Sequence, residues 1–181
     1  MTRLNHQKKA LLLINIIGGI AVLGSYALEL ITHPGQAASL WGNVPYGLRT
    51  ISSANMLPAA LGYIAYTLFL LLSPDLETSL LKHPAWFKAF NILYILILIP
   101  SALWMPLTFS YLAHPNPIVW LAVRLILDMV GLAGLGMLFA LLRIQPRKPA
   151  WAFWLACMGC VFFCIQTVVM DAMLWSNLFL A

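Results

Sequence analysis

Residues 87–112 read FKAFNILYILILIPSALWMPLTFSYL, an apolar run whose only charged residue is Lys88. At 1.5 Å per residue a helix over this run is about 39 Å long, which exceeds the roughly 30 Å of hydrocarbon in a bilayer. The run therefore predicts a membrane-spanning helix. The short segment AHPNP at 113–117 follows it and predicts a tight turn into a neighbouring helix.

The composition of the whole chain agrees with a membrane protein. Of its 181 residues 62% are hydrophobic and 8% are charged, and the mean hydropathy is +0.91, which excludes an ordinary soluble domain. Four more apolar runs are long enough to span a bilayer. We predict an all-α, polytopic membrane protein with one five-helix domain over residues 1–181, and helices at about 10–32, 50–73, 87–112, 117–143 and 151–178.

The basic residues outside the apolar runs or at their ends indicate the orientation in the membrane. Eight of them lie before the first run or in or next to the second and fourth connections, whereas the other two connections contain only Arg49. The positive-inside rule then places the N-terminus in the cytoplasm or its organellar equivalent and the C-terminus outside. We expect a bacterial inner membrane or an organellar membrane, and no nucleic-acid partner, because topology accounts for the net charge of +5. The eight are Arg3, Lys8, Lys9, Lys82, Lys88, Arg143, Arg147 and Lys148.

Polar and aromatic residues gather toward the outer ends of the predicted helices. Since each residue advances a helix by about 1.5 Å, these side chains can share one layer of the bundle. The longest connection, HPGQAASLWGNVPYGLR at 33–49, lies on the same side and could act as a lid. We predict a ligand pocket in the outer half of the bundle, with candidate binding residues Glu29, Trp41, Asn55, Trp104, Arg124, Asp171 and Trp175.

The predicted helix 117–143 contains two charged residues, and the partner of its arginine can be assigned in two ways. Arg124 and Asp128 are four apart, so they share a helix face and can neutralise each other. Alternatively, Arg124 reaches Asp171, Glu29 or a ligand carboxylate, because its guanidinium group suits planar acids. Ionisable side chains within membrane spans are candidate functional residues.

No residue set indicates a metal site or a catalytic centre. Cys157, Cys160 and Cys164 form one stripe of the last predicted helix, where small packing residues are the simpler interpretation. The four histidines all lie outside the apolar runs. We therefore predict neither a metal site nor catalytic residues, and a protein that is more readily a binding protein than an enzyme.

Residues 87–112 also carry a family resemblance. Their end is similar to the Leu-Trp-x-Pro-x-x-Phe pattern of the TspO/translocator protein family, tryptophan-rich five-helix membrane proteins, and the matching residues are Leu103, Trp104, Pro106 and Phe109. A fainter match runs through MLPAALGYIAY, where Gly62 stands on a family glycine.

The last apolar run extends this resemblance. MDAMLWSN resembles the family motif Leu-Asn-x-x-Ile-Trp, with Asp171 at the asparagine and Trp175 at the tryptophan. The resemblance implies a tetrapyrrole ligand, such as protoporphyrin IX or heme, or a sterol-like ligand, and no required cofactor.

These observations lead to one main hypothesis and two alternatives. The first is a membrane receptor or transporter for a hydrophobic planar ligand, with Trp104 and Trp175 stacking on it, Arg124 meeting a carboxylate and Asp171 orienting a polar group. The second is a membrane enzyme that uses Asp171 or Glu29 as acid or base on a lipid, since burial can suit a carboxyl group to proton transfer. The third is a non-catalytic accessory subunit of a membrane complex. The lipid bilayer is a partner in each case, and a homodimer is an option.

Overall fold

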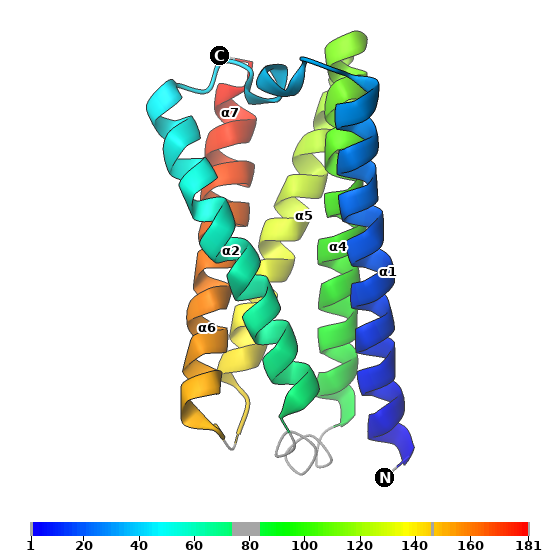
Figure 1. Cartoon of the computed structure of the whole chain (residues 1–181), viewed down its shortest axis with the longest axis vertical. Helices are drawn as coiled ribbons and strands as arrows, with labels where there is room; N and C mark the ends of the chain where they lie inside the picture. Colours follow the sequence, from blue (N-terminus) through cyan, green and yellow to red (C-terminus); the bar gives the residue numbers. More distant parts are fainter. Residues whose placement is uncertain (1, 74–83, 146, 181) are drawn as a thin grey trace.

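A computed structural model describes residues 2–73, 84–145 and 147–180, and within these ranges the chain is helical without a β-strand (Figure 1). Five helices are long and apolar enough to cross a membrane, which confirms the predicted multi-pass, five-helix fold. Lys82 lies outside the described residues, and the side chains of residues 2–5 and 84–86 are not described either, which includes Arg3.

The spans agree closely with the predicted runs, and the main differences lie at the helix ends. The first helix starts at Thr2 rather than near residue 10, because apolar length marks the membrane span and a helix can continue past it into polar sequence. The helices are α1 Thr2–Thr32, α2 Tyr46–Leu72, α4 Pro84–Ala113 and α5 Pro117–Leu142, and the last span consists of α6 Ala150–Cys164, η2 Ile165–Trp175 and the short α7 Ser176–Leu178.

The last span is not a uniform α-helix. Its segment η2, Ile165–Trp175, is π-helical, so its backbone hydrogen bonds join residues five apart rather than four apart. Residues 160–180, which include this segment, contain no proline or glycine that would mark the change. This change in helical register decides which side chains face the interior.

The helices form an open ring. α1 packs on α4, α4 on α5, α5 on α6 and η2, and α6 on α2, whereas α1 and α2 make few contacts with each other. Residues 33–45 and the C-terminal residues lie at one end of the bundle, which we call the loop end, and the described N-terminal residues lie at the other (Figure 1). Orientation in a membrane stays a prediction.

One close backbone contact fixes how α2 crosses α6. A Cβ atom added at Gly62 would lie 2.2 Å from the backbone oxygen of Gly159, and one added at Gly159 would lie 2.5 Å from Cα of Gly62. Real side chains do not approach backbone atoms this closely, so only two glycines allow this crossing. Small residues have this role in membranes, where lipid supplies no hydrophobic force between helices.

The main core contains large aromatic side chains from α2, α4 and α6. Tyr66, Phe90, Tyr94 and Phe153 are fully buried there. The three cysteines belong to the same core and are buried and free, in agreement with the packing interpretation. A smaller aromatic cluster occupies the loop end, and the cavity described next lies between the helices near it.

Candidate functional site

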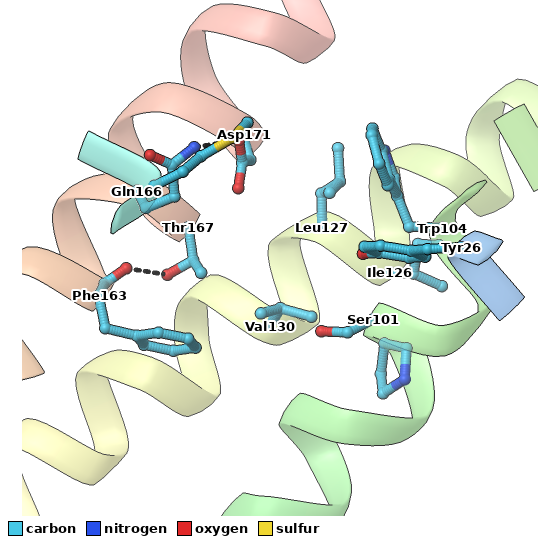
Figure 2. A pocket seen from close by; sticks show the side chains of 12 residues that line it. Tyr26, Ser101, Trp104, Ile126, Leu127, Val130, Phe163, Gln166, Thr167 and Asp171 are labelled. Atoms are coloured by element: carbon cyan, nitrogen blue, oxygen red, sulfur yellow. Dashed lines mark hydrogen bonds between the residues drawn. The ribbon is translucent and has the colours of Figure 1, made fainter. Parts of the chain in front are cut away.

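A cavity of about 220 Å³ lies between the helices (Figure 2). All five spans contribute to its wall, which is apolar except for a few polar groups. Of the residues predicted for a pocket, Trp104 and Asp171 line it. The described residues that line it are Tyr26, Met56, Pro100, Ser101, Trp104, Ile126, Leu127, Val130, Phe163, Gln166, Thr167 and Asp171.

Asp171 is held on one wall by an amide network. Gln166 Nε2 donates to Asp171 Oδ1 at 2.9 Å and to Ser52 Oγ at 3.1 Å. The other end of the same amide, Gln166 Oε1, accepts a hydrogen bond from Asn55 Nδ2 at 3.1 Å. Both N–H groups of the Gln166 amide are therefore used, and Gln166 links the Asp171 carboxylate on η2 to Ser52 of α2. Only Oδ1 of this carboxylate has a partner among the described residues, which leaves Oδ2 for a ligand.

The π-helical register makes this network possible. Gln166 and Asp171 are five residues apart, and in an α-helix a five-residue step turns the side chain by about 140° around the axis. In a π-helix residues five apart are joined by the backbone hydrogen bond and lie near one another on one face. η2 thus brings the amide and the carboxylate together at the cavity wall.

Aromatic rings form the opposite wall. Tyr26 of α1 and Trp104 of α4 meet edge to face, with ring centroids 5.8 Å apart. In Figure 2 these rings lie across the cavity from Asp171 and Gln166, and the Tyr26 hydroxyl points into the space between them. Trp104 Nε1 is buried without a hydrogen-bond partner among the described residues. An unsatisfied buried donor costs about 1–3 kcal/mol, so a ligand acceptor near this ring would be stabilising.

Trp175 lies next to the cavity rather than in its wall. Its ring packs edge to face on Trp104 at 5.6 Å, and its Nε1 donates to the Leu40 carbonyl oxygen at 2.8 Å. Trp41 belongs to the same aromatic cluster, together with Trp120 and other residues of the loop end. Trp175 therefore supports the ring that faces the cavity and connects it to the loop above.

The segment between α1 and α2, residues 33–45, covers this aromatic cluster. It contains the short helix η1, Ala37–Trp41. Arg49 holds the segment, because its Nε donates to the Val44 carbonyl at 2.6 Å and its Nη2 donates to the Gly42 carbonyl at 3.0 Å. The Asn43 N–H donates to the Phe179 carbonyl at 3.1 Å. The predicted lid is thus a structured cover, and its opening stays a prediction.

The remaining predicted residues lie elsewhere. Glu29 of α1 meets His33, the first residue after this helix, with Oε2 and Nδ1 3.3 Å apart, and does not line the cavity. Arg124 is exposed, and its Nη2 donates to Asn177 Oδ1 at 3.1 Å. Within the described chain Arg124 forms no ion pair with any of the three acids considered for it. Its outward direction keeps it from Asp171, and its guanidinium group bonds Asn177 rather than Asp128 on the same face.

Sequence reasoning missed several lining residues. Gln166 had a usable signal, since it is an amide inside an apolar run. Asn55 was found, although it acts through Gln166 and not in the cavity wall. Tyr26 and Ser101 gave no sequence signal, because tyrosine and serine occur widely in membrane helices.

The fold and the cavity define the class of protein: a multi-pass integral membrane protein with five spanning helices and an interhelical cavity. No protein-family model matches the chain, and no curated protein or solved structure matches it either. The resemblance to the TspO/translocator protein family therefore stays a prediction that rests on the motifs around Trp104 and Asp171.

Proposed function

We propose that this protein binds a compact, flat hydrophobic ligand in the interhelical cavity, as a receptor or transporter does. One observation carries the proposal: the Asp171 carboxylate faces two aromatic rings, Tyr26 and Trp104, across a mostly apolar cavity. Ligand sites have this composition, with mostly apolar walls and a few polar groups that set orientation.

The cavity volume limits the size of the ligand. An apolar cavity of about 150 Å³ holds one benzene ring, and pockets for drug-sized ligands start at about 300 Å³. At about 220 Å³ this cavity suits one ring or two fused rings. A tetrapyrrole or a sterol, which the family resemblance implies, would require the cavity to widen, and both remain ligands to be tested.

The charge of Asp171 indicates the polar group of the ligand. A carboxylate in an apolar cavity is stabilised by a cation or a hydrogen-bond donor, and the faces of Tyr26 and Trp104 also attract a cation. We therefore expect a ring system with an amine or another N–H donor directed at Asp171. The least closed side of the ring, between α1 and α2, is where we expect a ligand dissolved in the bilayer to enter, because Tyr26 and Met56 line the cavity from these helices.

The test compares two probes that differ in one group. Purified protein in lipid nanodiscs is titrated with naphthylmethylamine and with methylnaphthalene by calorimetry, and then with protoporphyrin IX, heme and cholesterol. We expect saturable binding of the amine. Asp171→Asn should weaken the amine about ten- to hundredfold, the range for a hydrogen bond to a charged group, and leave methylnaphthalene binding within about twofold.

Two tryptophan variants locate the site. Trp104→Ala should weaken both naphthalene probes, whereas Trp154→Ala, an exposed residue of α6 outside the cavity, should change neither. Failure of every probe to bind would contradict the proposed function. Binding that Asp171→Asn leaves unchanged would contradict the assignment of the polar group alone.

A further inference from the structure

The outer face of α5 carries two charged residues inside the membrane span. Arg124 and Asp128 are both exposed and four residues apart, and the surrounding face is apolar, with Leu125 and Leu132 exposed beside them. α5 has 26 residues, and Asp128 lies about 16 Å along it from Pro117. Asp128 is therefore near the middle of the roughly 30 Å hydrocarbon layer.

A carboxylate at this depth is disfavoured against lipid. Charged residues in membrane spans almost always face the bundle interior, a water-filled cavity or a partner. Asp128 has no hydrogen bond or ion pair to any described residue, and Arg124 reaches only Asn177, which is itself exposed. In a membrane this face of α5 requires a cover that the described part of a single chain does not supply.

The surface beside Asp128 is shaped to receive another helix. A groove of about 280 Å³ runs between α5 and η2, and among the described residues that line it Asp128 is the one with a charge. Gly131 and Ala172 have small side chains that permit close approach of a second backbone. The other lining residues are Leu132, Leu135, Val168 and Met173.

We propose that a second copy of this chain covers the face formed by Arg124, Asp128 and the groove. A two-fold interface uses the same patch on both subunits, so the patch must be its own complement. One base and one acid a turn apart meet this requirement, because Arg124 of each copy can pair with Asp128 of the other. The two copies of α5 run parallel about an axis along the membrane normal, and the long arginine side chain spans the one-turn offset.

The decisive test exchanges charges between subunits. The acidic variant Arg124→Asp and the basic variant Asp128→Arg carry different tags and are expressed separately and together. Subunit counting by single-molecule photobleaching in liposomes then reports the oligomer. We expect a wild-type dimer, a dissociation constant at least about tenfold higher for each variant alone, and a restored mixed dimer on coexpression, since the ion pairs re-form only in the mixture.

Matched controls separate the interface from general effects of charge. Arg143→Asp reverses a charge at the C-terminal end of α5, away from the groove, and should leave the dimer unchanged. Wild-type protein that stays monomeric at high protein-to-lipid ratios would overturn the proposal. Variants that dimerise like wild type, or a wild-type complex that contains a different protein or lipid on this face instead of a second copy, would also overturn it.

Cross-linking gives an answer even where a charge variant does not insert. Leu132→Cys places a thiol in the groove at a residue that is 70% exposed, and Leu23→Cys places one on α1 at a residue that is 72% exposed. The natural cysteines are buried and can stay. Oxidation in membranes should link Leu132→Cys into dimers much faster than Leu23→Cys, and equal rates would contradict the interface.

Discussion

Gly62→Ala should loosen the crossing of α2 and α6, because it adds a methyl group where two backbones touch. The new Cβ would lie 2.2 Å from the backbone oxygen of Gly159, and ordinary van der Waals contact begins at 3.4 Å. To lengthen this Cβ–oxygen distance from 2.2 Å to 3.4 Å, the two helices must move apart by about 1.2 Å at this point. Neither side can yield by rotating a side chain, since the clash is with backbone.

The magnitude follows from the lost contacts. A gap of about 0.5–1 Å already removes a quarter to a half of the dispersion energy between facing atoms, and overpacking typically costs about 1–3 kcal/mol. Since α2 and α6 share one of the most extensive packing interfaces in the bundle, we place Gly62→Ala in the upper part of this range. The lower free energy of unfolding should be accompanied by separation of the two helices.

Unfolding by sodium dodecyl sulfate in mixed micelles, followed by circular dichroism, measures the difference. Gly19→Ala is the matched control, because a Cβ at Gly19 of α1 meets nothing within 4 Å. The control should leave stability unchanged or raise it slightly. If Gly62→Ala is as stable as Gly19→Ala, the close crossing does not exist in the membrane.

Three further substitutions test the site. Gln166→Leu leaves Asp171 without its amide donor and should lower the free energy of unfolding by about 1–3 kcal/mol in the same detergent titration; wild-type stability would show that the network is not formed. Trp175→Phe removes the hydrogen bond to the Leu40 carbonyl, and backbone amides of residues 37–45 should exchange hydrogen faster by mass spectrometry. Arg49→Met removes two hydrogen bonds to the same segment and should speed hydrogen exchange there more than Trp175→Phe does. If neither variant changes the exchange rate of residues 37–45, other contacts hold the cover.

The five spans could be predicted from sequence for a physical reason. In lipid every backbone polar group must be paired within the segment, so an apolar run of sufficient length has essentially one structure available. Residues 87–112 and 117–143 illustrate this, because apolar length and one five-residue turn placed α4 and α5 to within a few residues. Helix ends depend on local capping and were less certain, as the early start of α1 at Thr2 shows.

The site was predicted only in part, because side-chain direction depends on helical register. Trp104 and Asp171 were found through their type and depth. Gln166 was missed because an α-helical reading puts it and Asp171 on different faces, and nothing in VVMDAM indicates a π-helix. The register follows from the packing of α6 and η2 against α2 and α5, and one sequence does not encode those contacts as a local pattern.

The two acids deepest in the spans show how far the direction of a side chain decides its role. Asp171 faces the interior, where an amide and two aromatic rings surround it, whereas Asp128 faces outward without a partner in the described chain. The proposals for ligand binding and for dimerisation can therefore be tested independently. Asp171→Asn should weaken the amine probe and leave the dimer intact, and Asp128→Asn should weaken the dimer while the amine still binds. Either substitution acting on both measurements would show that the cavity and the outer face of α5 are coupled through η2, which contributes residues to both.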